Sequence, residues 1–326
     1  MGVSGKIKVG IVGGAGYTAG ELIRILLYHP EVVLKYVQSG SNNGKALSSI
    51  HTDLLGECSM IFTDIVLEDT DLLFLCSGHG KSIEYLKSQI IPRHVKIIDL
   101  SHDFRLKRSG NDFIYGLPEL NRDQIISASR IANPGCFATA IQLALLPLAA
   151  SHLLVNEVHI NAITGSTGAG QAPTKTSHFS WRDNNLSVYK AFEHQHLGEI
   201  GESLLQAQPG FDKAVNFIPV RGNHTRGIFM SGYTTYNGSL DEANELFTSY
   251  YDTHPFVNMA PANPDLKQVV NTNKAILYLE KHGDKLMIIS CIDNLLKGAS
   301  GQAVQNMNLM YGLDERCGLN LKSIGF

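Results

Sequence analysis

A glycine-rich turn between a strand and a helix constrains the fold of this chain more than any other feature. Residues 6–13, KIKVGIVG, form a β-branched run that ends in glycine, and GGAGYTAG follows at 13–20. The next residues, ELIRILLYHPEV, place apolar side chains at 22, 23, 26 and 27, which is the spacing of one helix face. With a second strand at 32–39, this pattern predicts a βαβ unit of a parallel sheet.

Further alternation of strands and helices extends that sheet. DLLFLCSG at 71–78 and VKIIDLS at 95–101 have the composition of buried strands, and the helical stretch SIEYLKSQI lies between them. We therefore expect an α/β fold with a Rossmann-type doubly wound parallel sheet. After residue 136 a long apolar helix precedes β-branched runs joined by short loops, which predicts a second α+β domain with a mixed or antiparallel sheet. The expected domains are 1–135 for NADP binding, 136–295 for catalysis and oligomerisation, and 296–326 as a C-terminal helix that returns to the first domain.

The turn carries a dinucleotide fingerprint, because Gly13, Gly16 and Ala19 have the spacing G-x-x-G-x-x-A. The first glycine permits a tight turn, the second lets the backbone approach a pyrophosphate, and the small third residue lets the helix pack on the strand. The context of a preceding strand and a following helix separates this pattern from an ordinary glycine turn.

The end of the second predicted strand favours NADP over NAD. The stretch VQSGSNNGK offers no Asp or Glu for the ribose hydroxyls of NAD. Ser39, Ser41 and Lys45 are instead suited to hold a 2′-phosphate.

Cys136 occupies an unusual position in ANPGCFATA, directly after an Asn-Pro-Gly corner and at the start of an apolar helix. A helix N-terminus favours the thiolate, and nearby backbone N–H groups can stabilise an oxyanion. The alternative is a small buried apolar residue, and the local sequence alone leaves both interpretations open.

A reactive cysteine beside a nicotinamide suggests thioester chemistry, which needs a proton donor for the substrate oxygen. The richest histidine cluster is FEHQHLGE, with His194 and His196 two residues apart, and His224 is a second candidate. Two such histidines on a strand share a face and suit a metal, but no third ligand is evident nearby, so we expect no metal.

Composition excludes several classes of protein. The formal net charge is −3 and no Lys/Arg block stands out, so nucleic acid is not an expected partner. The five cysteines are odd in number, widely spaced and without a CxxC pair, which argues against a disulfide framework or a zinc site and suits a reducing compartment. The longest apolar run, AIQLALLPLAA, is too short to cross a bilayer. We expect a soluble cytoplasmic protein.

Taken together, these residues resemble the N-acyl-γ-glutamyl-phosphate reductases of arginine biosynthesis. The resemblance runs through nearly the whole chain and includes the opening GGAGYTAGELIRILLYHPEV, IIDLSHDFRL, YGLPEL, ANPGCFATA, TGSTGAGQ, HQHLGEI, RGI and DNLLKGASGQAVQNMN.

The resemblance implies a glyceraldehyde-3-phosphate-dehydrogenase-like fold, a homodimer or homotetramer, and NADPH-dependent reduction of N-acetyl-γ-glutamyl phosphate to the 5-semialdehyde and phosphate. Cys136 matches the family's catalytic cysteine, which forms a thioester, and His196, with His194 beside it, matches the family's acid/base histidine. The implied cofactor-binding residues are Gly13, Gly16, Tyr17, Thr18, Ala19, Ser39, Ser41, Lys45, Ser77, Gly168 and Asn294. The implied substrate-binding residues are Arg105, Asn133, Ser166, Gly168, Glu199 and Arg226.

The chain departs from the family pattern at several positions. It has Gly198 where the family often has Pro, Thr167 and Gln171 where the family often has Ser and Arg, and PVRGNH where the family often has a histidine-containing stretch. Compared with the family, this chain lacks a cation at position 171 and gains Arg221. This exchange suggests that its substrate carries a different N-acyl group, and a succinyl group would bring an extra carboxylate.

Other functions fit less of the sequence. Aspartate-semialdehyde dehydrogenase and a carrier-linked aminoadipyl-phosphate reductase share the chemistry, but LSHDFRL and YGLPEL fit the glutamyl family better. A non-catalytic NADP-binding regulator would need neither Cys136 nor the histidine cluster, and a structural interaction protein explains none of the glycine loops.

Overall fold

The computed structural model describes residues 5–78, 80–107 and 110–325. The chain divides into two compact units, each built from separate stretches of sequence. The first unit comprises the described residues up to Leu117, with Asn121–Pro134 and Ala299–Asn320. The second comprises Pro118–Leu120, Gly135–Gly298 and the described residues from Leu321 onward. The chain therefore passes between the units five times, after Leu117, Leu120, Pro134, Gly298 and Asn320.

A six-stranded parallel sheet forms the centre of the first unit, in the order β2-β1-β3-β4-β6-β5. Its strands are β1 (Ile7–Val12), β2 (Val32–Gln38), β3 (Leu72–Leu75), β4 (Lys96–Asp99), β5 (Ile114–Tyr115) and β6 (Arg130–Ala132). The strand order reverses between β1 and β3, and ligands of doubly wound sheets bind at the carboxyl ends of such strands. The predicted doubly wound parallel sheet is confirmed.

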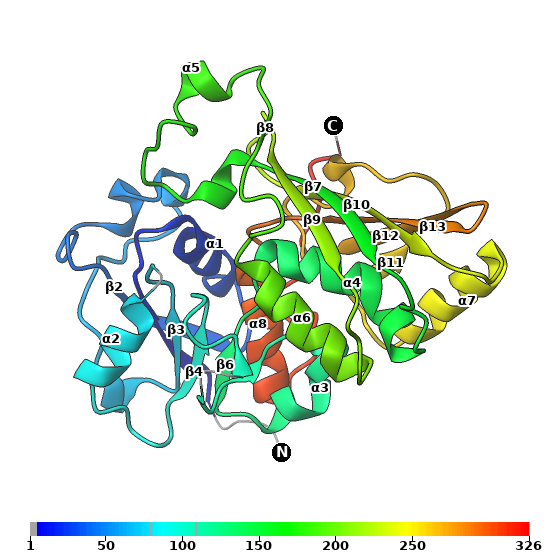
Figure 1. Ribbon diagram of the computed structural model, residues 1–326. Helices are drawn as coiled ribbons and strands as arrows, with labels where there is room; N and C mark the ends of the chain where they lie inside the picture. The colour runs from blue at the N-terminus through cyan, green and yellow to red at the C-terminus, as the bar shows by residue number, and fades with distance from the viewer. Residues whose placement is uncertain (1–4, 79, 108–109, 326) are drawn as a thin grey trace. The chain divides into compact units, whose positions relative to one another are not determined.

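The helices of this sheet include one from near the end of the chain (Figure 1). They are α1 (Tyr17–Leu26), α2 (Lys81–Ser88), α3 (Pro118–Ser127) and α8 (Ser300–Met310), with short turns η1 (Leu47–Ser49), η2 (Thr52–Leu54) and η3 (Leu67–Asp69). Helix α1 buries Leu22, Ile23 and Leu26, the apolar face that the sequence predicts. Helix α8 is buried along its whole length and packs against α1 and β4. Helix α3 kinks at Asn121, where the chain returns from the second unit to the first.

A seven-stranded mixed sheet forms the second unit, in the order β11-β12-β13-β10-β7-β9-β8. Its strands are β7 (Val158–Thr164), β8 (Ser187–Val188), β9 (Val215–Arg221), β10 (Ile228–Thr235), β11 (Val257–Met259), β12 (Ala275–His282) and β13 (Lys285–Ile292). Strand β9 is parallel to β7, which makes the sheet mixed, because α6 (His196–Ala207) carries the chain back across the sheet. The other parallel pair is β11 with β12.

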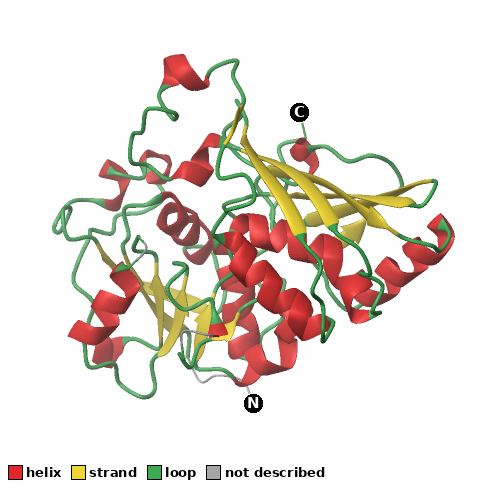
Figure 2. Cartoon of the chain, viewed as in Figure 1, coloured by secondary structure: helices red, strands yellow, loops and turns green. Residues whose placement is uncertain are grey.

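Helices α4 (Cys136–Ala150) and α6 lie along one face of this sheet (Figure 2). Pro147 lies inside α4 and cannot donate to the carbonyl of Leu143, four residues earlier. The Tyr251 hydroxyl, at the end of α7 (Leu240–Tyr251), donates to that carbonyl at 2.6 Å instead. Helix α7 begins at a Ser239–Glu242 capping box.

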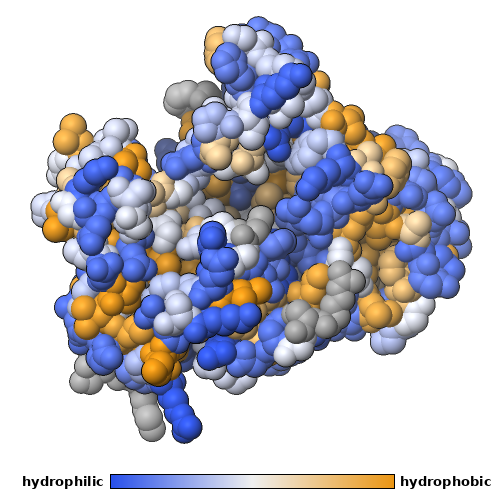
Figure 3. Space-filling model, turned by 60° about the vertical axis from the view of Figure 1, so that its left-hand side comes forward, coloured by the Kyte–Doolittle hydropathy of each residue, from blue (hydrophilic) through white to orange (hydrophobic). Residues whose placement is uncertain are grey.

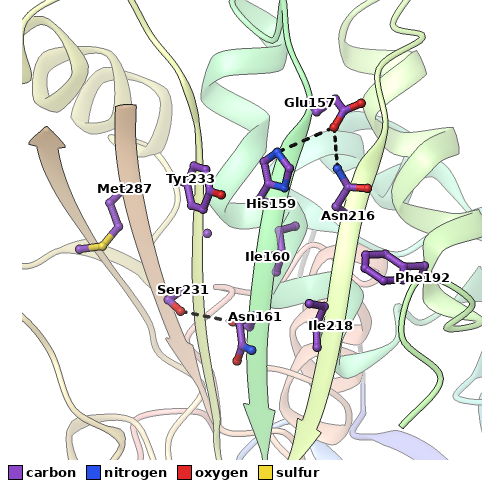
Figure 4. A pocket seen from close by; sticks show the side chains of 11 residues that line it. Glu157, His159, Ile160, Asn161, Phe192, Asn216, Ile218, Ser231, Tyr233 and Met287 are labelled. Atoms are coloured by element: carbon purple, nitrogen blue, oxygen red, sulfur yellow. Dashed lines mark hydrogen bonds and ion pairs between the residues drawn. The ribbon is translucent and has the colours of Figure 1, made fainter. Parts of the chain in front are cut away.

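The opposite face of the sheet carries exposed side chains. There Glu157, His159 and Asn161 of the β7 region, with Tyr233 and Met287, line a hollow of about 550 Å³ (Figure 4). Tyr233 is 44% exposed and stacks on His159 with ring centroids 5.0 Å apart. We call this surface the open face of the sheet.

An arm spanning residues 171–186, with α5 (Phe179–Arg182) at its tip, extends from the edge of the same sheet between η5 (Ser166–Ala169) and β8. The tip, uppermost in Figure 3, is largely hydrophilic. Buried Arg182 ties the arm to the sheet, because it donates to the carbonyl oxygens of Thr176, Asn185 and Arg221.

Candidate active site

The dinucleotide turn of the first unit requires glycine at position 13. Gly13 has φ +79°, and a Cβ there would lie 2.7 Å from the backbone nitrogen of Ser77. Both the left-handed conformation and the close approach of the loop after β3 exclude a side chain. The turn after β1 and the predicted residue Ser77 are thereby brought together at the point where the strand order reverses.

The N-terminus of α1 is open beside this turn. Gly16 is the N-cap, and a Cβ there would meet no atom within 4 Å. Ala19 is fully buried, whereas Tyr17 is 40% exposed. The carbonyl of Thr18 accepts a hydrogen bond of 2.8 Å from the Ser300 hydroxyl. Exposed backbone at a helix N-terminus fits the pyrophosphate of a dinucleotide.

The residues predicted to hold a 2′-phosphate gather after β2 around one residue that the sequence analysis missed. The Asn42 amide donates to the hydroxyls of Ser39 at 3.1 Å and Ser41 at 3.2 Å. Its oxygen accepts from the Lys45 ammonium at 3.1 Å. Two hydroxyls and one cation around a single asparagine form a set of donors suited to a phosphate.

In the second unit, Cys136 is the first residue of α4. It is partly exposed, whereas residues 137–149 are buried. A Cβ at Gly298 would lie 2.8 Å from the Cβ of Cys136, so glycine at 298 makes room for the thiol. Two other cysteines differ: burial raises the pKa of Cys76 far above its usual range and that of Cys291 to about 12, which suits inert packing residues.

The two predicted histidines lie at the start of α6 rather than on a strand. His196 is the first residue of the helix and His194 precedes its N-cap. Their ring centroids are 4.6 Å apart, and both side chains are buried. Burial, helped by the charges of Lys190 and Arg221, lowers the pKa of His194 to about 4. His194 is therefore a neutral imidazole near pH 7.

Glu199 connects the histidine to the cysteine turn. One carboxylate oxygen accepts from the backbone N–H of Gly135 at 3.0 Å, and the other lies 3.7 Å from His196 Nε2. Glu199 is 3% exposed, and its place one turn into α6 brings it to both partners. A buried carboxylate beside an imidazole stabilises the imidazolium, as general acid/base catalysis requires.

An aromatic wall surrounds these groups, and the sequence analysis missed it. Phe137 packs edge-on against His194 at 5.4 Å and against Phe217 at 5.1 Å between ring centroids. Tyr189 lies 5.8 Å from His194, and burial together with the charge of Cys136 raises its pKa to about 12. No motif marks Tyr189 or Phe217; strand pairing and packing bring them to the site.

Asn294 joins two loops of the second unit. Its oxygen accepts from the backbone N–H of Gly227 at 2.7 Å, and its nitrogen donates to the Thr167 hydroxyl at 3.0 Å. Arg226, next to Gly227, pairs with the buried carboxylate of Asp293 at 2.9 Å. These contacts set the position of η5, which contains the predicted residues Ser166 and Gly168.

Arg105 and Asn133, both predicted to bind substrate, are buried in the first unit. Arg105 donates from Nε to the Asn133 carbonyl at 2.8 Å and from Nη2 to the Leu100 carbonyl at 3.0 Å. The Asn133 side chain donates to the Ala299 carbonyl and accepts from Asn306. These contacts order the backbone that leads to Gly135 and Cys136.

The described residues contain neither a metal-binding cluster nor a membrane-spanning helix. Within the described ranges, no three His, Cys, Asp or Glu side chains gather closely enough to hold a metal ion. Across the same described residues, no helix has both the length and the apolar character needed to cross a membrane.

Comparisons with known proteins agree with this architecture. The family model described as "Semialdehyde dehydrogenase, NAD binding domain" matches residues 8–128, and the one described as "Semialdehyde dehydrogenase, dimerisation domain" matches residues 136–294. Aspartate semialdehyde dehydrogenase II of Vibrio cholerae has a TM-score of 0.72 at 16% identity, over 94% of this chain and 98% of that chain. An aspartate semialdehyde dehydrogenase with NADP from Candida albicans has a TM-score of 0.71 at 12% identity, with the same coverage. These solved structures confirm the fold.

Sequence relatives are much closer. Proteins named N-acetyl-gamma-glutamyl-phosphate reductase from Bacteroides fragilis and Flavobacterium johnsoniae are each 58% identical, over 98% of this chain and 100% of the relative. One from Azobacteroides pseudotrichonymphae is 59% identical with the same coverage. The resemblance seen in the sequence is confirmed, and the chain belongs to the N-acetyl-gamma-glutamyl-phosphate reductase family of semialdehyde dehydrogenases.

Proposed function

We propose that this enzyme reduces an N-acyl-γ-glutamyl phosphate, named as the N-acetyl compound for its relatives, to the 5-semialdehyde with release of phosphate. One observation carries the proposal. Glu199 accepts a hydrogen bond from the turn before Cys136 and lies 3.7 Å from His196 Nε2, so a nucleophile at a helix N-terminus and an imidazole share one buried carboxylate.

The bonds formed and broken in this reaction can be followed at Cys136. The Cys136 thiolate attacks the γ-carbonyl carbon, a C–S bond forms, and the C–O bond to phosphate breaks. When bound, NADPH supplies the hydride that reduces the thioester carbon. Hydride addition leaves an oxyanion, which takes a proton from the His196 imidazolium to form the thiohemiacetal. His196 takes that proton back as the C–S bond breaks, which releases the aldehyde and restores the thiolate.

His196 is the proton carrier in this proposal. His194, with a pKa of about 4, is a neutral imidazole near neutral pH and therefore a poor general acid. His196 has the Glu199 carboxylate beside it, which stabilises the imidazolium formed during proton transfer. The first-turn backbone amides of α4 are the candidate donors to the oxyanion, because the Gly135 N–H is already bonded to Glu199.

Two anionic groups are common to all such substrates, the phosphate and the α-carboxylate. We assign them to Arg105 and Arg226, with Asn133, Ser166 and Gly168 positioning the surrounding backbone. The sequence predicts Arg105 as the residue that binds the phosphate or the carboxylate. Arg226 directly precedes Gly227, whose backbone N–H donates to Asn294.

The function is tested by running the reaction in reverse. Purified enzyme receives NADP, inorganic phosphate and the N-acetyl or N-succinyl derivative of glutamate 5-semialdehyde, and NADPH formation is followed. We expect turnover that requires phosphate. Turnover of aspartate semialdehyde with neither N-acyl compound accepted would contradict the proposal.

The cofactor assignment gives a separate prediction. Lys45→Ala removes the cation of the donor set around Asn42, so KM for NADPH should rise about 10- to 100-fold, the value of one charge-assisted hydrogen bond. KM for NADH should not change. Lys35→Ala, which removes another lysine of β2, is the control. An equal rise for both cofactors would remove Lys45 from the 2′-phosphate site.

We also propose a homo-oligomer, a dimer or a tetramer, that forms through the open face of the second unit. The family model matched there is described as a dimerisation domain. The face exposes Tyr233 and lines a hollow with Met287, which a second copy would cover. The five cysteines form no disulfide, which supports a location in the cytoplasm.

A further inference from the structure

Arg221 shares a sheet face with the catalytic groups. It is the last residue of β9, where side chains alternate between the two faces. Phe217, four residues earlier, packs against Phe137 of α4 and against His194, so Arg221 points to that same side. In register it lies opposite Thr164, the last residue of β7, after which the loop containing η5 begins.

The guanidinium lies close to the thiol's own neighbours. Its carbon is 4.8 Å from the centre of the Tyr189 ring. The phenol of Tyr189 is influenced by both Cys136 and Arg221, and the charge of Arg221 contributes to the low pKa of His194. Arg221 and Cys136 therefore belong to one cluster of side chains in the second unit.

This cation has no anionic partner. Among the described residues no carboxylate pairs with Arg221, and its Nε is buried without a hydrogen-bond acceptor. Its charged neighbours are also cations: buried Arg182, which donates to carbonyl oxygens, and exposed Lys190. Arg226, by contrast, has Asp293. Holding an unpaired cation among other cations is costly, and an anionic ligand would remove that cost.

The charges of the substrate indicate which anionic group Arg221 would bind. The phosphate and the α-carboxylate are assigned to Arg105 and Arg226, and an N-acetyl group is neutral. Arg221 is a third arginine, and it matches a third anionic group. A planar guanidinium binds a carboxylate through two parallel hydrogen bonds.

We propose that Arg221 forms a carboxylate subsite beside Cys136, so that the preferred substrate carries an N-acyl group ending in a carboxylate, as a succinyl group does. This inference rests on the proposed function and specifies its substrate class. Arg221 acts here as a specificity-determining residue, and the bonds made and broken at Cys136 are unchanged.

The test compares two semialdehydes, N-succinyl- and N-acetyl-L-glutamate 5-semialdehyde, with NADP and phosphate. For the wild-type enzyme we expect kcat/KM at least about 100-fold higher with the N-succinyl compound, because a site built for a charged group rejects an analogue that lacks it. In Arg221→Leu the ratio of the two kcat/KM values should fall about 100-fold, because only the N-succinyl compound carries the carboxylate that Arg221 binds. Arg221→Lys keeps the charge and should keep a reduced preference for the N-succinyl compound.

Lys190→Gln is the matched control, because it removes a neighbouring exposed cation and should leave the preference intact. Thermal unfolding of each variant verifies folding, and if Arg221→Leu does not fold, Arg221→Lys carries the comparison.

Equal turnover of the two compounds by the wild-type enzyme overturns the subsite. So does an equal loss with both compounds in Arg221→Leu, which would assign Arg221 to the shared α-carboxylate. Both outcomes leave the proposed function standing, whereas turnover of neither compound overturns the function as well.

Discussion

The Cys136→Ser enzyme is expected to lose phosphate-dependent NADPH formation by at least about 10⁴-fold while it still binds NADPH. Serine preserves the size of the side chain beside Gly298, but its hydroxyl is far weaker as a nucleophile and a poorer leaving group. The dinucleotide turn and the residues assigned to the 2′-phosphate lie in the first unit and Cys136 in the second, so NADPH binding should be largely kept. NADPH fluorescence titration measures that binding.

Mass spectrometry of the intact protein tests the covalent step directly. Wild-type enzyme mixed with the acyl phosphate in the absence of NADPH should gain the mass of one acyl group at Cys136, and Cys136→Ser should gain none. Cys317→Ser, which changes another partly exposed cysteine, should acylate and turn over normally. If Cys136→Ser kept activity within about 10-fold of wild type, thioester chemistry would be excluded.

Lys297→Met is expected to destabilise the second unit by about 3–5 kcal/mol, the typical cost of leaving one member of a buried ion pair uncompensated. The ammonium of Lys297 lies 2.7 Å from the Glu119 carboxylate, and both side chains are fully buried. The second carboxylate oxygen of Glu119 has no hydrogen-bond partner. Burial acts to raise the pKa of Glu119, but the charges of Lys297 and His254 prevail and hold it below its usual value.

Urea unfolding measures this effect, with the transitions of the two units followed separately. Lys285→Met is the control, because its pair with Asp284 is exposed and should contribute less than about 1 kcal/mol. Combining Lys297→Met with Glu119→Gln should recover part of the loss, because the remaining buried charge is then removed. A loss below about 1 kcal/mol in Lys297→Met would show that the pair is solvated in solution.

Periodic local patterns made the fold class predictable. The glycine turn, the apolar face of α1 and the buried strands are each encoded within a few residues, so they could be read without tertiary information. The parallel pairing of β7 with β9 could not, because a long connection containing the arm and α6 separates the two strands.

The active-site residues divide in the same way. Cys136 stands out locally because of its Asn-Pro-Gly corner, whereas the role of Glu199 depends on α6 bringing it to Gly135. The spacing of His194 and His196 does not show whether they lie on a strand or a helix; in the structure α6 begins at His196, with Gln195 as its N-cap. Asn42, Tyr189 and Phe217 belong to no motif, and only the folded chain places them beside the predicted residues.

The five passages of the chain between its units have a consequence for synthesis. The parallel sheet begins with β1, yet α8, which packs against α1 and β4, comes from near the opposite end of the sequence. A nascent chain therefore cannot complete its dinucleotide-binding unit before the ribosome has passed residue 310. Until then the faces of α1 and β4 that α8 covers stay exposed, so folding of this unit depends on the protection of those surfaces during elongation.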